Sequence, residues 1–420
     1  MDAVELFHPL LREWFYDRFS GPTSIQEKAW EAIAAGDHVL LSAPTGGGKT
    51  LAAFLWSINA LVRGRLPLGK TVILYVSPLK ALNNDVYKNL TVPLKEISAR
   101  FAAATDPLPA ITVMTRSGDT PQSERRRMRT RPPEILITTP ESLNVLLTSG
   151  AAFALFSHLA VVILDEIHAV IESKRGTHLV SAVERLTLIA GEFQRISLSA
   201  TARPLPLIAA FSGGFLAGPS GRLRPRPVTI ISDPTPKRYL LHVSSPHPEI
   251  PDDSEDAWWS RVTAACLDII EKNRSTLFFA ASRKKTEKLA RLLNEKAGTL
   301  IAYSHHGALS REIRLSVEEL LKEGKLKAIV ATGTLELGID IGALDEVVLV
   351  QAPHSVSQAV QRIGRAGHQV GGESRGTLLP LDGLDFLHLA PWPERSSITT
   401  LRKRRRCLRR STYWPRSSSP

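Results

Sequence analysis

Eight consecutive residues place the strongest constraint on how this chain folds. After the apolar run His38–Ser42 and before an amphipathic segment, the chain reads Ala43-Pro44-Thr45-Gly46-Gly47-Gly48-Lys49-Thr50. Glycines let backbone N–H groups converge on phosphate oxygens, and the N-terminus of the next helix adds a partial positive charge. Apart from Ala43, which replaces a glycine, this is the phosphate-loop pattern, and the alternative is a glycine-rich loop that ends in Lys-Thr by chance. The pattern predicts nucleotide binding, with Lys49 on the β and γ phosphates and Thr50 on magnesium.

Short β-branched runs alternate with amphipathic segments over most of the length, which is typical of an α/β fold with a parallel sheet covered by helices on both faces. The predicted strands are His38–Ser42, Thr71–Ser77, Ile111–Thr115, Ile135–Thr138, Ala160–Leu164, Ile196–Ser199, Val228–Ser232, Thr276–Ala281, Thr299–Tyr303, Lys327–Ala331, Glu346–Val350 and Gly376–Pro380. Two stretches rich in Pro, Ser and Asp, Asp233–Pro236 and Ser244–Asp256, interrupt this alternation. The sequence therefore predicts two α/β domains, residues 1–234 and 235–385.

The end of the chain differs from the rest in composition. Residues 391–420 contain nine basic residues and one acidic residue, so the formal net charge of +12 leaves only +4 for the preceding part. Residues 386–420 are predicted to form a disordered basic tail; a nucleic-acid-binding arm and a lost reading frame are the alternatives. Because the basic pI arises mostly here, it is weak support for nucleic-acid binding by the folded part.

Cysteine content and hydropathy exclude several classes of protein. The two cysteines, Cys266 and Cys407, are too few for a disulfide framework, a cysteine zinc site or an iron–sulfur cluster, and a reducing cytoplasm fits best. No apolar run reaches the ~18 residues of a membrane span, so no membrane partner is expected. Hydrophobic residues make up 43% of the chain, which excludes a wholly disordered protein.

The run Val161–His168 is a second candidate component of the site. Its first four residues are apolar, and Asp165 and Glu166 follow at the C-terminal end of the predicted strand. In doubly wound sheets, ligands bind at that end of the strands. Asp165 is therefore expected to hold magnesium, and Glu166 to orient and deprotonate the attacking water. A strand that ends in Asp-Glu is commonplace by itself, but the phosphate loop upstream favours the functional interpretation.

The run Gln361–His368 is the third component. Arg362 and Arg365 are three residues apart, so on a helix they share a face and suit the charge that develops on a transferred γ-phosphoryl group. The alternative is an ordinary surface helix with ion pairs. The arginines fall in the second predicted domain, and the loop and carboxylates fall in the first. We therefore expect an ATP site in the cleft between domains, which closes with nucleotide and opens after hydrolysis.

Taken in order, these segments resemble the motif set of superfamily 2 helicases of the DEAD/DEAH-box type. Beyond the three components, the resemblance covers Thr23–Gln26, Ser77–Leu82, Thr138–Leu143, Ser199–Thr201, Ser304–Gly307 and Ala331–Gly342. The residues of four segments resemble those of the large helicase-related (Lhr) proteins. This resemblance spans roughly residues 5–385. These segments are Asp165–His168, Ser304–Gly307, Leu335–Gly342 and Gln361–His368.

This resemblance implies two tandem RecA-like domains and an ATP hydrolase that depends on nucleic acid. It implies a translocase that moves 3′ to 5′ on single-stranded DNA and unwinds DNA duplexes or RNA–DNA hybrids, in repair or nucleic-acid processing. ATP and Mg²⁺ are the implied cofactors. The strand is expected to be held through phosphates and sugars, without base readout.

The resemblance also implies roles for further residues. Gln26 would read adenine, Gly338 and Asp340 would contact the nucleotide, and Ser199 and Thr201 would couple hydrolysis to nucleic-acid contact. The implied nucleic-acid contacts are Pro78, Leu79, Lys80, Thr139, Pro140, His305, His306, Gly307 and Thr332.

Three features depart from the family pattern. His368 stands where many superfamily 2 helicases have arginine, which places the arginine-finger role on Arg365 with Arg362 in support. Gly333 replaces a small hydroxyl residue. The family continues with a winged-helix domain and further domains, whereas this chain ends in the basic tail, so we expect a truncated or frame-shifted member.

Three hypotheses follow for the function. The leading one is an ATP-driven helicase, which intact Lys49, Glu166 and Arg365 favour. The rival is a truncated remnant that binds ATP and nucleic acid without productive unwinding. The third is a remodeller that displaces proteins and never separates strands. DNA against RNA preference, protein partners and the oligomeric state, a monomer included, stay open.

Overall fold

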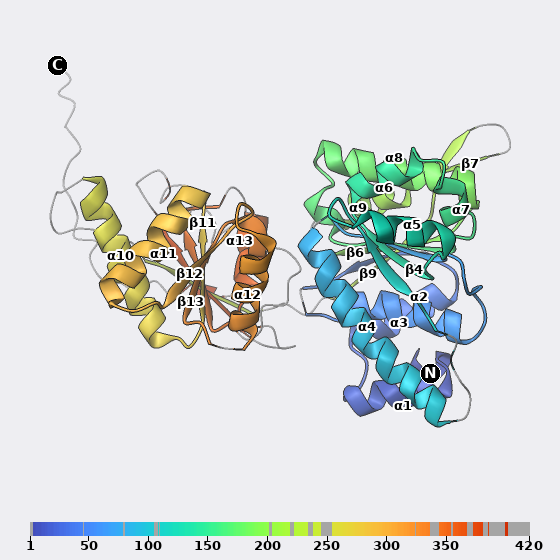
Figure 1. Ribbon diagram of the computed structural model, residues 1–420, viewed down its shortest axis with the longest axis horizontal. Helices are drawn as coiled ribbons and strands as arrows, with labels where there is room; N and C mark the ends of the chain where they lie inside the picture. Colours follow the sequence, from blue (N-terminus) through green and yellow to red (C-terminus); the bar gives the residue numbers. More distant parts are fainter. Residues whose placement is uncertain are drawn as a thin grey trace, which may run out of the picture. The chain divides into compact units, whose positions relative to one another are not determined.

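The computed structural model divides into two compact units, the first built mainly from Met1–Pro236 and the second beginning at Lys237 (Figure 1). Each unit is an α/β structure, and each is described by itself. The structure describes residues 3–44, 46–78, 80–104, 108, 110–200, 204–218, 222–233, 238–244, 254–323, 325–336, 344–353, 356–367, 373–380, 385 and 400–401.

A parallel sheet forms the centre of the first unit. Over the described residues it has seven strands in the order β3-β4-β2-β5-β6-β1-β9, and every neighbouring pair is parallel. The strands are β1 His38–Ser42, β2 Ile73–Val76, β3 Val113–Arg116, β4 Ile135–Thr138, β5 Val161–Leu164, β6 Gln194–Ser199 and β9 Val228–Ser232. Because all run the same way, their carboxyl ends meet at one edge, the carboxyl edge.

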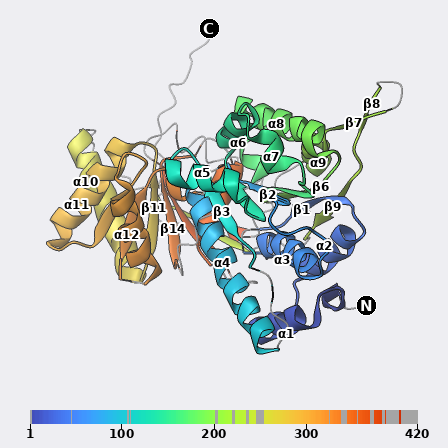
Figure 2. The same cartoon turned by 45° about the vertical axis from the view of Figure 1, so that its right-hand side comes forward.

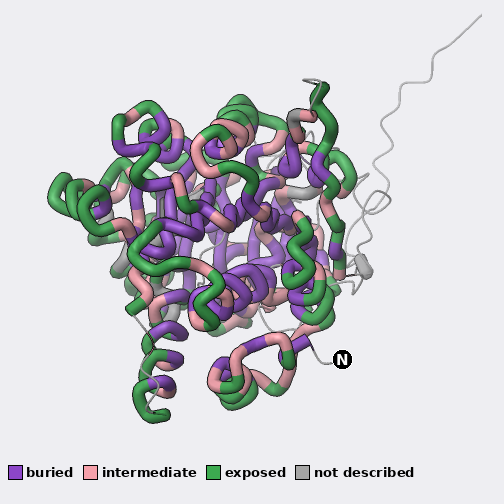
Figure 3. The backbone as a smooth tube through the Cα atoms, turned by 90° about the vertical axis from the view of Figure 1, so that its right-hand side faces the viewer, coloured by how far each residue is buried: buried purple, intermediate pink, exposed green. Residues whose placement is uncertain are grey.

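Helices cover both faces of this sheet, as the near-continuous apolar strands require. Val39 and Leu41 of β1 face a buried cluster with α1 to α4, whereas Leu40 faces a second cluster with α5 to α9 (Figures 1 and 2). Burial is therefore highest along the strands and falls toward the outer helix surfaces (Figure 3). These helices are α1 Pro9–Arg18, α2 Ser24–Ala34, α3 Lys49–Val62, α4 Lys80–Ala103, α5 Gln122–Thr130, α6 Pro140–Leu147, α7 Ala152–Phe156, α8 Lys174–Ala190 and α9 Leu205–Gly213.

Short elements complete the first unit. The 3-10 turns η1 and η2 span Ala3–Leu6 and Ile167–Ala169. An antiparallel hairpin of β7 Phe215–Ala217 and β8 Leu223–Pro225 was absent from the predicted strands. In this unit, three predicted strands are confirmed to the residue, namely β1, β4 and β9, as is β14 Glu346–Val350 in the second unit. Strand β6 begins two residues before its predicted start, because the buried Arg195 extends it without adding an apolar residue to the pattern.

The second unit repeats the parallel design. Its described strands follow the order β12-β13-β11-β14-β15-β10-β16. The bounds are β10 Tyr239–Val243, β11 Thr276–Ala280, β12 Ala302–His305, β13 Ala328–Ala331, β14 Glu346–Val350, β15 Ser374–Leu379 and β16 Thr400–Leu401. Strand β10 was not predicted. Strand β16 pairs with β10 and lies within the tail for which disorder was predicted, so that prediction is wrong for these two residues. The other tail residues after Asp385 lie outside the described ranges.

Four helices and a short turn accompany the second sheet within the described residues. They are α10 Glu255–Lys272, α11 Arg283–Ala297, α12 Arg311–Lys322, α13 Val356–Ile363 and the 3-10 turn η3 Gly333–Leu335. Helices α10 and α11 share a buried cluster with β11, whereas α13 contacts β14 and β15. Throughout the described ranges, every helix is too short or too polar to cross a lipid bilayer.

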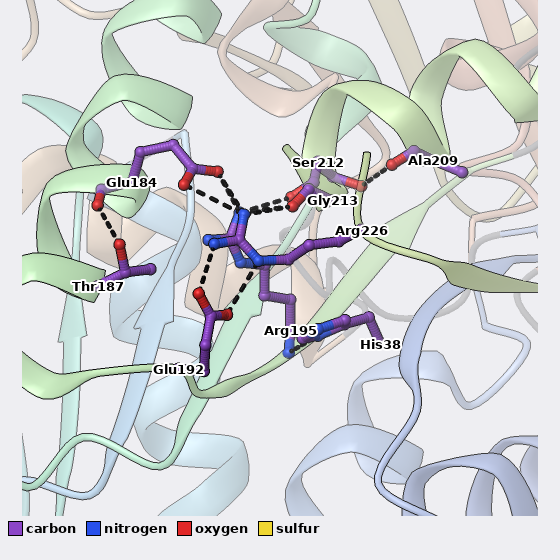
Figure 4. A network of polar contacts seen from close by, with 9 residues as sticks. All are labelled: His38, Glu184, Thr187, Glu192, Arg195, Ala209, Ser212, Gly213 and Arg226. Carbon is purple, nitrogen blue, oxygen red and sulfur yellow. Dashed lines mark hydrogen bonds and ion pairs between the residues drawn. The ribbon is translucent and has the colours of Figure 1, made fainter. Parts of the chain in front are cut away.

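A charged network holds the first sheet together at the edge opposite its carboxyl ends (Figure 4). Arg195 Nη1 of β6 and Arg226 Nη1, just before β9, donate to the same carboxylate oxygen, Glu184 Oε1 of α8, at 2.7 and 2.9 Å. Arg226 also donates to both oxygens of Glu192, at 2.8 and 2.9 Å. Both arginine side chains are 1% exposed, so each depends on these carboxylates for compensation of its charge.

Glu184→Ala should therefore destabilise the protein more than Glu192→Ala. Loss of Glu184 removes a carboxylate from two buried guanidinium groups and should lower the free energy of unfolding by about 3 kcal/mol. The Glu192 side chain is 51% exposed, and its loss should cost about 1 kcal/mol. Urea unfolding of the two variants beside the wild type measures both values. Equal losses would show that Glu184 does not carry the network.

Candidate nucleotide and nucleic-acid site

The phosphate loop lies between β1 and α3 and needs glycine at two described positions. Gly46 and Gly48 have φ angles of 84° and 79°, which L-residues with side chains rarely adopt. A Cβ atom on Gly48 would also lie 2.5 Å from Gln26 Nε2. Gln26 therefore lies directly against the glycine that precedes α3, where the first backbone N–H groups of a helix have no partner within the helix.

Lys49, the first residue of α3, is 8% exposed. Its ammonium group donates hydrogen bonds to the backbone carbonyls of Ala43 and Pro44, at 2.6 and 2.9 Å. The side chain therefore folds back over the loop and places its charge among the backbone groups that line it. Thr50 follows on the same helical turn and is partly buried.

Gln26 is buried at the start of α2 and contacts the loop directly. Its Oε1 accepts a hydrogen bond from the Thr23 backbone at 2.9 Å, which completes a capping box. Its Nε2 donates to the carbonyl of Gly48 at 3.3 Å, and Thr23 Oγ1 donates to the carbonyl of Gly47 at 3.3 Å. The start of α2 thus supports the loop from one side.

Asp165 follows β5 and is fixed through both carboxylate oxygens. Oδ1 accepts a hydrogen bond from the backbone N–H of Glu166 at 2.8 Å, and Oδ2 accepts a short one from the hydroxyl of Tyr75 on β2. Tyr75 is fully buried and stacks on Phe54 of α3, with 5.1 Å between ring centroids. Helix α3, which carries Lys49, is therefore linked through one aromatic side chain to the Asp165 carboxylate.

Glu166 adopts a left-handed backbone conformation, with φ of 48°. This conformation is costly for a non-glycine residue and is found at functional sites. Within the described part of the chain, its buried Oε2 accepts no hydrogen bond, and His168 Nε2 lies 3.4 Å away. His168 Nδ1 accepts a hydrogen bond from the backbone N–H of Ala200 at 3.2 Å. The imidazole therefore connects the acidic pair to the end of β6, where Ser199 lies buried.

The pKa values of this cluster show how strongly its charges interact. Burial, followed by the negative charge of Glu166, raises the pKa of Asp165 to about 6, although Tyr75 and Lys49 oppose the shift. Burial and the Lys49 charge lower the pKa of His168 to about 4. His168 is thus neutral near pH 7, which agrees with an Nδ1 that accepts a hydrogen bond and a proton on Nε2. Two carboxylates packed this closely favour a cation beside them.

The strand order separates the carboxyl edge into two halves. The phosphate loop follows β1, Asp165 follows β5, and Ser199 ends β6, and these three strands are neighbours. The predicted strand contacts Pro78 and Thr139 follow β2 and β4, which are neighbours on the other half. Pro78 is buried, and Thr139 is 2% exposed because its hydroxyl accepts a hydrogen bond from Ser142 as the N-cap of α6. Pro140 is the first residue of α6 and is also buried.

In the second unit, the predicted strand contacts surround the end of β12. His305 and His306 are 1% and 2% exposed and lie 3.0 and 2.8 Å from carboxylate oxygens of Glu318 and Glu287. The next residue, Gly307, is exposed. The backbone N–H of Thr332 donates to the carbonyl of His305, so the ends of β12 and β13 are joined at these residues.

The predicted helix for the arginine pair is wrong in its extent. Helix α13 ends at Ile363, so Arg362 lies in its last turn and Arg365 lies beyond it. The chain turns there, with the Arg365 N–H donating to the Arg362 carbonyl at 3.0 Å, and a shared helix face is lost. Arg362 lies over the Phe279 ring, 5.0 Å from its centroid, whereas Arg365 is buried at 2% exposure. Glycines at 364 and 367 end the helix early, a signal that the arginine spacing obscured.

Six expected site residues lie wholly or partly outside the part of the chain that the structure describes. Lys80 begins α4, and only its backbone is described. The remaining members of this group lie outside the described residues, namely Thr45, Leu79, Thr201, Gly338 and Asp340.

Three residues at the site were missed by sequence reasoning. Tyr75 lies inside an apolar strand and reads as a core residue, while His168 was treated only as part of a run. Arg175 lies at the start of α8 and donates to Glu141 and to the Pro78 carbonyl. For Tyr75 and Arg175, the signal is contact across the sheet or between helices, which linear spacing does not display.

Two family models match parts of this chain. The models for the DEAD/DEAH box helicase and for the helicase conserved C-terminal domain match residues 23–206 and 261–369. The Lhr helicase/uracil glycosylase of Escherichia coli is 39% identical over 92% of this chain and 28% of its own length. The ATP-dependent helicase Lhr-Core protein 2 of Thermococcus barophilus is 43% identical, over 92% of this chain and 45% of its own length.

A solved structure is similar over nearly the whole chain. The Mycobacterium smegmatis helicase Lhr bound to ssDNA and AMP-PNP has a TM-score of 0.84 and 43% identity, covering 96% of this chain and 52% of that one. Fold and site together define a phosphate-loop protein with two RecA-like domains. Within that class, the chain belongs to the Lhr family of DEAD/DEAH-box helicases. It spans between 28% and 52% of the length of these relatives.

Lys49→Ala should abolish tight nucleotide binding without unfolding the protein. The substitution removes the ammonium group that the loop surrounds and leaves the backbone of α3 intact. Equilibrium binding of a fluorescent ATP analogue, beside a thermal melt, measures both properties. Lys28→Ala on α2 is the matched control, because that lysine is exposed. Unchanged affinity in Lys49→Ala would remove the phosphate-loop assignment.

Proposed function

We propose that this chain is an ATP-driven translocase and helicase that moves 3′ to 5′ on single-stranded DNA and separates DNA duplexes or RNA–DNA hybrids. The observation that carries the proposal is the carboxyl edge of the first sheet, where β6 alone separates the strand before the phosphate loop from the strand before the acidic pair. We assign the ATP-binding domain to residues 1–234 and the second motor domain to 235–385. We place the activity in the cytoplasm, where the buried thiol of Cys266 stays reduced.

The nucleotide roles follow from the contacts around the loop. On ATP binding, Lys49 would exchange its two backbone carbonyl partners for the β and γ phosphates. Gln26 would turn toward adenine from its place beside Gly48. Glu166 would orient and deprotonate the attacking water, because its buried Oε2 is free to accept a hydrogen bond from it. Arg365, with Arg362 in support, is assigned to the charge on the γ-phosphoryl group, and Gly338 and Asp340 to nucleotide contacts.

Magnesium fits the oxygen groups of the first unit. Asp165 is a buried carboxylate whose pKa is raised, and a cation beside it would favour its charged form. The described residues contain no cluster of three or more His, Cys, Asp or Glu that could hold a metal by themselves. Mg²⁺ is typically bound by one or two carboxylates together with substrate phosphates. Asp165 and Thr50 would hold the ion, which would neutralise phosphate charge when bound.

We infer the substrate from the residues that follow β2 and β4 and from the solved structure of the Mycobacterium smegmatis relative. The relative's structure contains ssDNA, and we extend that substrate class to this chain. Pro78, Thr139 and Pro140 in the first unit would contact the strand, as would the region of Gly307 and Thr332 in the second. Ser199 and Thr201 would couple hydrolysis to these contacts through the His168–Ala200 hydrogen bond.

Strand separation tests the proposal directly. A duplex with a 3′ single-stranded tail should be unwound in the presence of ATP and Mg²⁺, while the same duplex with a 5′ tail should stay intact. ATP hydrolysis by the same preparation should increase when single-stranded DNA is added. The matched control is Glu166→Gln, which keeps the shape of the side chain and should bind ATP without turnover.

Each other outcome of this experiment would assign a different activity to this chain. Unwinding from a 5′ tail would refute the polarity. Stimulated hydrolysis without strand separation would identify a motor that moves on nucleic acid or displaces proteins. Binding of ATP and DNA without stimulated hydrolysis would contradict the motor and favour a non-productive remnant.

Tyr75→Phe should weaken the binding of Mg²⁺ with ATP. The substitution removes one hydroxyl from the buried core and leaves Asp165 Oδ2 without the donor that orients it. Loss of such a supporting hydrogen bond typically costs about 10–100-fold in metal affinity. The Mg²⁺ concentration for half-maximal ATP hydrolysis, and for half-maximal nucleotide binding, should rise by that factor. Tyr87→Phe, on the exposed side of α4, is the control, and equal Mg²⁺ dependence in both variants would contradict the role of Tyr75.

A further inference from the structure

One arginine in the segment after β5 connects that segment with those that follow β2 and β4 at the carboxyl edge. Arg175, the second residue of α8, donates through Nη2 to Glu141 Oε2 at 3.0 Å and through Nε to Glu141 Oε1 in a short bond. Its Nη2 also donates to the carbonyl of Pro78. Glu141 lies in the first turn of α6, directly after Thr139 and Pro140. The planar guanidinium group therefore fixes the loop after β2 relative to the start of α6.

The position of Glu141 supports a specific pairing. Although partial burial raises its pKa, hydrogen bonds from Arg175 and from its own backbone outweigh that effect and lower the pKa below the usual value. Helices α6 and α8 lie side by side, so the pair forms between neighbouring N-terminal turns (Figure 1). An ion pair at 37% and 57% side-chain exposure contributes little to stability. Its two-pronged geometry instead fixes an orientation.

Arg175 is also connected rigidly to the acidic pair. Nine residues separate Asp165 from Arg175, and η2 occupies part of them. Ser173 caps α8 through a hydrogen bond to the Gly176 N–H, and its hydroxyl donates to the Val170 carbonyl at 2.7 Å. A Cβ atom on Gly176 would lie 2.2 Å from the Val170 oxygen, so glycine permits α8 to begin directly against this turn. The start of α8 is therefore packed directly against the turn that follows the acidic pair.

We propose that Arg175 is a positioning residue that couples the acidic pair to the strand-contacting loops. Through the η2 turn and α8, a shift at Asp165–Glu166 moves the guanidinium group, which moves the Pro78 loop and the start of α6 together. This inference rests on the proposed function, because it concerns how nucleic acid stimulates ATP hydrolysis. It adds a residue outside the segments for which a role was assigned above.

Arg175→Ala should weaken the stimulation of ATP hydrolysis by single-stranded DNA without changing basal ATP hydrolysis. Basal ATP hydrolysis and the KM for ATP should stay at wild-type values, because Arg175 contacts neither the phosphate loop nor the acidic pair directly. The single-stranded DNA concentration that gives half-maximal stimulation should rise about tenfold, within the range usual for coupling between sites. Steady-state hydrolysis at varied DNA and varied ATP concentrations measures each quantity.

Three further variants make the test specific. Arg185→Ala is the matched control, because Arg185 is on the same helix and also donates to a carbonyl of α6, that of Leu147, at 3.3 Å. It should leave stimulation unchanged. Arg175→Lys keeps the charge but loses the two-pronged contact and should give an intermediate shift. Arg175→Ala combined with Glu141→Ala should be no worse than the stronger single variant, since both act through one contact.

The possible results distinguish this inference from the proposed function. If DNA stimulates the wild type and Arg175→Ala equally, the coupling role is overturned while the proposed function stands. If Arg175→Ala loses basal hydrolysis and thermal stability in parallel with stimulation, the residue is structural and the inference is again overturned. If DNA fails to stimulate the wild type, the proposed function falls and the inference falls with it.

Discussion

The parallel direction of the strands in the first unit is the constraint on which the candidate site depends. Strand β1 delivers the phosphate loop, β5 the acidic pair, and β2 and β4 the predicted strand contacts, all at the same edge. In an antiparallel sheet, alternate strands would end on opposite sides. The network of Arg195, Arg226 and Glu184 links β6, the start of β9 and α8 at the opposite edge of the sheet. The loops at the carboxyl edge are therefore supported by a rigid sheet.

Burial makes the acidic pair effective and also costly. Desolvation raises the pKa of Asp165, and the neighbouring Glu166 adds repulsion. Tyr75, the Glu166 backbone N–H and Lys49 oppose that effect and keep the carboxylate in one orientation. The remaining cost of desolvation and of repulsion between the two carboxylates favours a ligand that brings positive charge. The packing therefore supports the proposed site for a cation together with phosphates.

The sequence predicted well what depends on local pattern. Glycine spacing located the phosphate loop, and an apolar run followed by two acids located β5 and the residues after it. Strand pairing, by contrast, places Tyr75 opposite Ile163, two residues before Asp165. Helix packing brings Arg175 to Glu141. The arginine spacing predicted a shared helix face at 362 and 365, but the following glycine ended the helix at Ile363. Strand β10 was missed because linker-like residues flank it on both sides.

The two halves of the carboxyl edge have to communicate if hydrolysis is to move a strand. Of two contacts described above, one lies within the half that carries the phosphate loop and the other crosses to the half that follows β2 and β4. His168 joins the acidic pair to the end of β6 through Ala200, and Arg175 joins the segment after β5 to those after β2 and β4. Both begin within the ten residues that follow Asp165. The short stretch after β5, with its left-handed Glu166 and its cap against Gly176, is therefore the element through which the proposed coupling would transmit a change at the nucleotide.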